Sequence, residues 1–206
     1  MPDSSLIGKL REFNYVAVER DGGAPKPCLK HFLELLAPRK IRYSFLEPRP
    51  AGQGNTLSDL HGLEEFPLHT DGANLISPPD YIFLMAPRSR VTPTLIADPR
   101  SVIDIDSSFA RDAVFTIRRQ GRNFPSFFVE RSRGESMVRY NADTMIPQNS
   151  AAFKVVEFMS GLRHHAVQIS WAKISLLVLN NRAMLHGRGN IAKPWSHLRR
   201  LEVYLK

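Results

Sequence analysis

The chain has 206 residues, of which 43% are hydrophobic and 23% are charged, which is enough apolar material for one globular domain with a sizeable core. It contains no apolar run long enough to cross a bilayer, and its first residues lack the layout of a signal peptide, so we expect a cytoplasmic protein with no membrane partner. The single cysteine, Cys28, excludes an internal disulfide and a thiolate-rich metal site, whereas the net charge of +8 does not choose among nucleic acid, acidic small molecules and a basic surface.

Short strands dominate the elements that the sequence predicts. In chain order these are a strand at 14–18, a helix at 27–36, a strand at 41–46, a loop at 48–55, strands at 81–85 and 94–97, a hairpin of 126–130 with 136–140, a helix at 150–163, apolar strand material over 166–180 and a last strand at 198–205. The second helix is predicted from apolar residues that recur at helical spacing, namely Ala152, Val155, Val156, Met159 and Leu162. We expect this apolar stripe to pack against a sheet.

Many short strands with few long helices are typical of a closed or double-sheet β architecture, in which strand ends can carry a metal site. We therefore predict an α+β fold that is mainly β. The sequence contains no repeat, low-complexity segment or interdomain linker. It therefore predicts a single domain over residues 1–206.

A His-x-Asp tripeptide, His69-Thr70-Asp71, follows the apolar stretch Phe66-Pro67-Leu68, and a distant histidine, His186, is available to complete a site. Two imidazoles and one carboxylate on one face of Fe(II) leave three coordination positions open, as an oxygenase needs. Residues i and i+2 at a strand end can both turn toward one ion, while the third ligand comes from another strand. The alternative is a hydrogen-bonded turn at the tripeptide and a buried structural histidine.

Four blocks in a fixed order give the tripeptide its context: 66–73, 78–84, 94–98 and 181–188. Together they resemble the Fe(II)- and 2-oxoglutarate-dependent dioxygenases of the taurine dioxygenase and clavaminate synthase type, whereas residues 1–60 carry no such motif. The resemblance implies a double-stranded β-helix, or jelly roll, with a few flanking helices and with iron near one open end. It assigns the iron ligands to His69, Asp71 and His186.

The same resemblance implies residues for 2-oxoglutarate. Its family carries an Arg on the last strand that binds the distal carboxylate of the cosubstrate, and Arg200 fits that register, although Ser196 replaces an Arg that usually precedes it. Arg199 is the alternative, because strand alternation gives it the same face as the apolar Leu201. Thr94 matches a Thr that supplies a hydroxyl to the same carboxylate. Three further residues are weaker candidates for the pocket: Asn74, Arg188 and Trp195.

The implied function is oxidation, most simply hydroxylation, of a C–H bond in a small molecule, with Fe(II) and 2-oxoglutarate as cofactors and O2 as oxidant. An amino acid or a natural-product intermediate is the expected substrate, and Asp71 argues against halogenation, because halogenating relatives have a small residue there. Two alternatives remain open: a nucleic-acid-directed oxygenase and a non-enzymatic basic β-domain that binds a partner. The first draws on the basic residues Arg118, Arg119, Arg122, Arg131, Arg133 and Arg139. The sequence leaves a homo-oligomer open.

Overall fold

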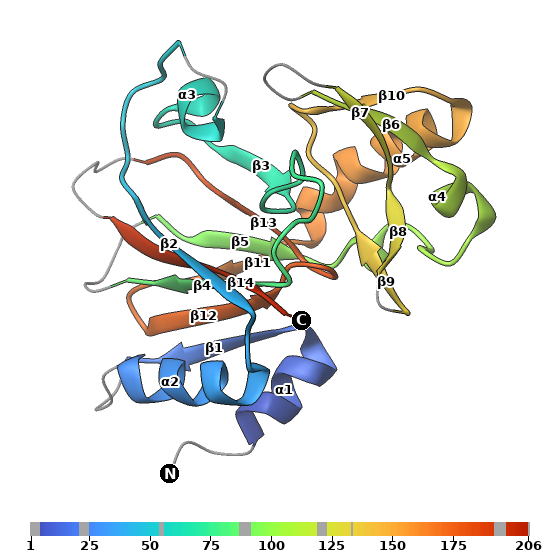
Figure 1. Cartoon of the computed structure of the whole chain (residues 1–206). Coiled ribbons are helices and arrows are strands. Elements are labelled where there is room, and N and C mark those ends of the chain that lie inside the picture. Colours follow the sequence, from blue (N-terminus) through green and yellow to red (C-terminus); the bar gives the residue numbers. More distant parts are fainter. Residues whose placement is uncertain are drawn as a thin grey trace.

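The computed structural model describes residues 5–20, 25–53, 56–86, 92–118, 123–132, 134–191 and 197–205. Two antiparallel sheets lie against each other (Figure 1). The larger has the order β1 (Tyr15–Glu19), β12 (Ile174–Asn180), β4 (Tyr81–Met85), β14 (Leu198–Tyr204) and β2 (Lys40–Leu46). The smaller has the order β11 (Val167–Ile169), β5 (Thr94–Ala97), β13 (Leu185–Arg188) and β3 (Phe66–His69). No two neighbours within either sheet are consecutive in the chain, so residues distant in sequence meet throughout.

The inner faces of the two sheets share one apolar core. Ile82 and Leu84 of the larger sheet belong to one buried cluster together with Ile96 of the smaller sheet and Trp171. The intervening residue Phe83 points to the other face of the larger sheet. Strands that are buried on both faces read as unbroken apolar runs, which explains the composition of β4.

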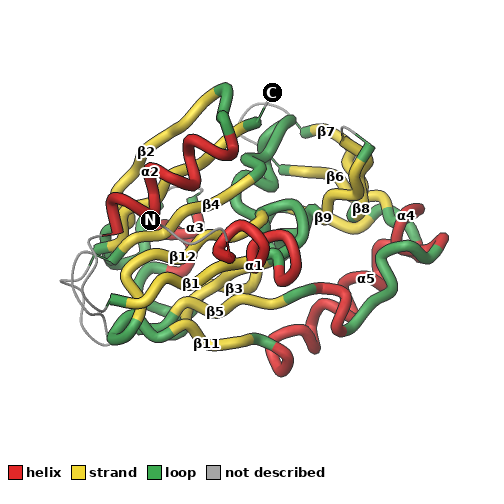
Figure 2. Tube along the Cα trace, turned by 90° about the horizontal axis from the view of Figure 1, so that it is seen from below, coloured by secondary structure: helices red, strands yellow, loops and turns green. Residues whose placement is uncertain are grey.

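Two helices cover the outer face of the larger sheet. Helix α1 (Ser5–Phe13) contributes Leu10 and helix α2 (Pro25–Leu36) contributes Phe32 to a cluster that also contains Leu201 and Val203 of β14. Figure 2 shows both helices over the strands of this sheet. The apolar face of β14 therefore points away from the smaller sheet.

The remaining elements lie beyond the outer face of the smaller sheet or beside it. They are α3 (Leu57–His61), the 3-10 turn Pro99–Ser101, α4 (Ser108–Asp112), β6 (Val114–Ile117), β7 (Phe124–Phe127), β8 (Val129–Ser132), β9 (Glu135–Val138), β10 (Met145–Pro147), α5 (Ser150–Gly161) and the 3-10 turn Leu162–His165. The predicted stripe on α5 is confirmed, since Ala152, Val155 and Met159 join one core cluster with Leu95 of β5.

The structure confirms a mainly β architecture with few helices, but two local predictions are wrong and one helix was missed. The predicted strand at 126–130 is divided at Phe128, so that β7 pairs with β6 while β8 pairs with β9. The apolar stretch at 166–180 is broken by a turn at 170–173, which sends β11 and β12 to different sheets. Helix α1 was not predicted. Among the described residues, no helix is both long and apolar enough to cross a membrane.

Candidate metal centre

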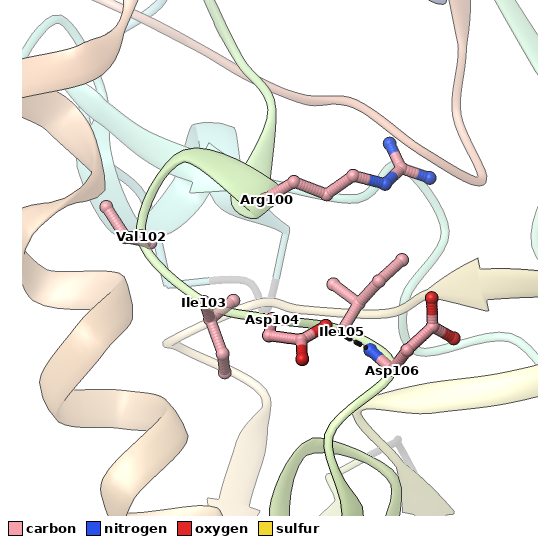
Figure 3. A pocket seen from close by; sticks show the side chains of 6 residues that line it. All are labelled: Arg100, Val102, Ile103, Asp104, Ile105 and Asp106. Carbon is pink, nitrogen blue, oxygen red and sulfur yellow. Dashed lines mark hydrogen bonds between the residues drawn. The ribbon is translucent and has the colours of Figure 1, made fainter.

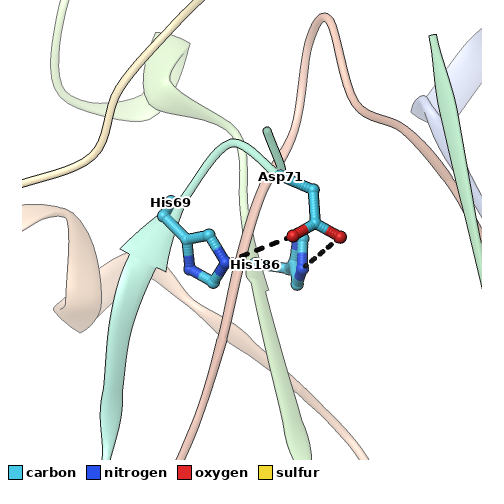
Figure 4. A group of neighbouring side chains, drawn as sticks. All are labelled: His69, Asp71 and His186. Carbon is cyan, nitrogen blue, oxygen red and sulfur yellow. Dashed lines mark ion pairs between the residues drawn. The ribbon is translucent and has the colours of Figure 1, made fainter. Parts of the chain in front are cut away.

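His69, Asp71 and His186 lie together at the edge of the smaller sheet (Figure 4). His69 and His186 are directly opposite each other where β3 pairs with β13, and their ring centroids are 4.6 Å apart. The Asp71 carboxylate oxygens lie 3.7 Å from Nε2 of His69 and 3.8 Å from Nε2 of His186. The three side chains can offer ligand atoms within 4.8 Å of one another, although the residues are only 4%, 6% and 8% exposed. The structure thus brings together the three predicted ligands.

The protonation states of these groups suit a divalent cation. Nδ1 of His69 lies 2.9 Å from the carbonyl oxygen of Pro67 and donates its hydrogen there, while Nε2 faces the Asp71 carboxylate. Burial, with the nearby charges of His69 and Arg200, lowers the pKa of His186 to about 3, so this imidazole is neutral. Burial favours a neutral Asp71, but the Arg200 guanidinium and the two neighbouring histidines together outweigh it and hold the pKa of that carboxyl well below its usual 3.8. The neutral imidazole of His186, the ionised carboxylate of Asp71 and Nε2 of His69 together fit an Fe(II) ion.

Asn181 holds the backbone of Asp71 in place. Its side-chain oxygen accepts a hydrogen bond from the Asp71 backbone N–H at 3.0 Å, and its side-chain nitrogen donates to the carbonyl oxygens of Asp71 at 3.0 Å and Pro79 at 2.9 Å. From the other side, Thr70 N–H donates to the carbonyl oxygen of Tyr140 at 2.8 Å. Sequence reasoning missed Asn181, although it lies within one of the four blocks that carried the family resemblance.

A buried ion pair connects two of those blocks. The guanidinium of Arg182 donates to the carboxylate of Asp80, which also accepts from the backbone N–H of Leu205 at 2.6 Å. The two side chains are almost completely buried. These contacts connect the turn that follows β12 to the start of β4 and to the end of β14. They therefore hold the backbone of this turn, which includes Asn181, in place.

The close approach of β3 and β13 requires a glycine. A Cβ atom on Gly187 would lie 2.6 Å from the carbonyl oxygen of Phe66, closer than real Cβ contacts come. The register of the two strands shifts between His186 and Arg188, on either side of this residue. Gly187 thereby lets the two strands lie close enough for both imidazoles to reach one ion.

Arg200 faces the cluster and Arg199 does not. Nη1 of Arg200 donates to the two carboxylate oxygens of Asp71, at 2.9 and 3.0 Å. Arg199 is exposed on the opposite face of β14, where its guanidinium lies 5.8 Å from the ring centre of Phe45. The argument that the apolar face of this strand points inward is wrong, because helices α1 and α2 cover that face.

A cavity of about 800 Å³ opens beside the three clustered side chains. This size suits a small molecule. Its lining includes the predicted Asn74, Thr94, Arg188 and Arg200 as well as all three predicted metal ligands. A second cavity, of about 420 Å³, is lined by Arg100 and residues 102–106 and contains none of the clustered residues (Figure 3).

No protein-family model matches the chain, and no curated protein matches it. Solved structures do. The chain superposes on the non-heme iron oxygenase OrfP in complex with Fe and alpha-ketoglutaric acid with a TM-score of 0.68 and 15% identity, over 99% of this chain and 81% of OrfP. It superposes on PvcB from Pseudomonas aeruginosa with a TM-score of 0.68 and 17% identity, over 99% of this chain and 80% of PvcB.

An asparagine oxygenase in complex with Fe(II), 3-hydroxyasparagine and succinate matches with a TM-score of 0.63 and 17% identity, over 78% of this chain. The chain spans little more than half, 56%, of that oxygenase. The chain has the fold of these iron oxygenases.

Arg188, the weaker candidate for an anion-binding residue, lines the cavity, but its guanidinium is already engaged by neighbouring groups of the protein. Its guanidinium donates to the carbonyl oxygens of Gly62 and Glu64 and lies 3.6 Å from the ring centre of Phe66. Asn141, which was not predicted, also lines the cavity. Its side-chain oxygen accepts hydrogen bonds from two backbone N–H groups. Its NH2 group has no acceptor among the described residues, and the residue lines the cavity.

Of the three described arginines in the basic region at 118–139, one is buried rather than on the surface. Arg139 is only 2% exposed, and it donates to the carbonyl oxygens of Ala73, Leu75 and Ile76 and to Glu130. It therefore supports the loop after Asp71. Arg118 and Arg131 are exposed, whereas Arg119, Arg122, Arg133 and the predicted pocket residue Trp195 lie outside the described residues.

Proposed function

We propose that this protein is an Fe(II)- and 2-oxoglutarate-dependent oxygenase that hydroxylates a C–H bond of a small molecule. The observation that carries the proposal is the buried cluster of His69, Asp71 and His186, which opens into a cavity of about 800 Å³. The similarity in fold to iron oxygenases, one of them solved with alpha-ketoglutaric acid, supports the same reading.

We also propose a specific type of β fold and a class of substrate. The two sheets with a shared core support a double-stranded β-helix in a single domain. The names of the matched structures include hydroxylated asparagine and arginine, and the cavity has the size for such molecules. We therefore infer an amino acid or a related small metabolite as substrate.

The metal would be held by Nε2 of His69, Nε2 of His186 and the Asp71 carboxylate. Bound Fe(II) supplies O2 activation coupled to the oxidative decarboxylation of 2-oxoglutarate to succinate and CO2. Asp71 fills a ligand position with a carboxylate, which favours hydroxylation over halogenation. The protein's own contribution is placement, because Arg200 carries a permanent charge and a planar donor pair that match a carboxylate, and Thr94 offers a hydroxyl.

The decisive experiment begins with metal-free protein under anaerobic conditions. Addition of Fe(II) and 2-oxoglutarate should give a weak visible charge-transfer band, and admission of O2 should release labelled succinate in the presence of one member of a panel of amino acids and small carboxylic acids. His69→Ala should abolish both signals. If iron-loaded protein releases no succinate at all, with or without a panel compound, the proposal is wrong.

The two adjacent arginines provide a matched pair of variants. Arg200→Ala should raise the Kd for 2-oxoglutarate by about 100-fold, because two charge-assisted hydrogen bonds together contribute about 3 kcal/mol. Arg199→Ala should leave that Kd unchanged, since Arg199 lies on the outer face of β14. Calorimetric titration of Mn(II)-loaded protein measures both values, and the opposite ranking would transfer the role to Arg199.

A further inference from the structure

Trp171 makes a hydrogen bond that sequence reasoning did not anticipate. It lies in the turn between β11 and β12 and is only 1% exposed. Its indole Nε1–H donates to Oγ1 of Thr94 at 2.9 Å, across 77 positions of the chain. This is a buried polar contact inside the apolar core between the two sheets.

This contact determines whether the Thr94 hydroxyl can donate a hydrogen bond to another group. An indole has one donor and no acceptor, so in this pair the hydroxyl oxygen must accept and its own hydrogen must point elsewhere. No acceptor among the described residues takes that hydrogen. Because Thr94 lines the cavity of about 800 Å³, its hydroxyl is left as a donor for a ligand there.

The indole itself is fixed. Its ring lies in one buried apolar cluster with Leu84, Ile96 and Leu198. The backbone carbonyl of Trp171 accepts a hydrogen bond from the guanidinium of Arg20 at 3.1 Å, and the same nitrogen donates to the carbonyl of Ile174 at 2.9 Å. Both ends of the turn are thereby fastened, so the direction of the indole N–H is set before any ligand binds.

We propose that Trp171 is a positioning residue for the cosubstrate: its indole N–H orients the Thr94 hydroxyl so that this hydroxyl donates to the distal carboxylate of 2-oxoglutarate. The inference rests on the proposed function, and it extends that function to a residue that does not touch the ligand.

The test is a double-mutant cycle on 2-oxoglutarate binding to Mn(II)-loaded protein, measured by calorimetry without O2. Trp171→Phe removes the indole N–H and keeps an aromatic ring, and Thr94→Val removes the hydroxyl at nearly constant volume. Each should raise the Kd by about tenfold, which corresponds to one hydrogen bond. The double variant should bind no more weakly than Thr94→Val, because Trp171 acts only through the hydroxyl. Under turnover, Trp171→Phe should raise KM for 2-oxoglutarate and retain kcat.

Ile169→Val is the matched control. Ile169 lies opposite Thr94 on β11 and in the same core cluster, but its side chain makes no hydrogen bond. It should lose stability and keep the wild-type Kd. If Trp171→Phe also keeps the wild-type Kd, or if the effects of Trp171→Phe and Thr94→Val add, the positioning role is refuted. Wild-type protein that binds Mn(II) but no 2-oxoglutarate would refute the proposed function instead.

Discussion

Replacing Asn181 with alanine should weaken metal binding at the proposed centre without changing any of the three proposed ligands. The substitution removes three hydrogen bonds and leaves the Asp71 N–H, the Asp71 carbonyl and the Pro79 carbonyl without their buried partner. At about 1 kcal/mol for each bond, the free energy of unfolding should fall by about 3 kcal/mol. Urea denaturation of the metal-free protein measures this loss.

The effect on the metal has a separate cause. Once its backbone is released, Asp71 no longer holds its carboxylate beside the two imidazoles before the ion arrives. Loss of such support typically lowers metal affinity by about 10- to 100-fold. Calorimetric titration with Mn(II) or Co(II), at a temperature where the variant is folded, measures this change.

The preceding residue gives the control. Asn180 makes two comparable hydrogen bonds, to the Asn14 side chain at 2.9 Å and from the Arg182 backbone N–H at 3.1 Å, but none to Asp71. Asn180→Ala should therefore lose about 2 kcal/mol of stability and keep its metal affinity within about twofold. If Asn181→Ala binds metal as tightly as wild type does, or if Asn180→Ala loses as much affinity, the support attributed to Asn181 is wrong.

Two further predictions concern the frame around the site. Arg182→Met leaves Asp80 buried beside an apolar side chain, so urea denaturation should show a loss of about 3–5 kcal/mol, and adding Asp80→Asn should recover part of it. A loss below about 1 kcal/mol would mean that the pair is not structural. Gly187→Ala sets a Cβ atom 2.6 Å from the Phe66 carbonyl oxygen and should force β3 away from β13, with a metal affinity at least about tenfold weaker. Gly189→Ala, where a Cβ would meet nothing within 4 Å, should bind metal normally.

The sequence by itself determined the local features of this protein. It predicted the strands 81–85 and 94–97 with the bounds that the structure shows. Strands buried on both faces are unbroken apolar runs, and here prolines near the ends of the runs mark where the strands begin and end. It also predicted the three clustered side chains, because the ordered blocks that contain His69, Asp71 and His186 resemble a known family of iron oxygenases. These signals depend on short stretches of chain, and so they can be read without knowing the partner strands.

Only the tertiary structure decided which face of β14 meets the cavity. The periodicity of a strand separates an apolar from a polar face, but it does not tell which one is covered by helices, and here α1 and α2 cover the apolar face and leave Arg200 on the side of the metal centre. The hydrogen bonds that hold the site residues in place could not be predicted from the sequence either. Asn181 reaches Asp71 across 110 positions and Trp171 reaches Thr94 across 77, and contacts between such distant residues exist only once the two sheets have assembled.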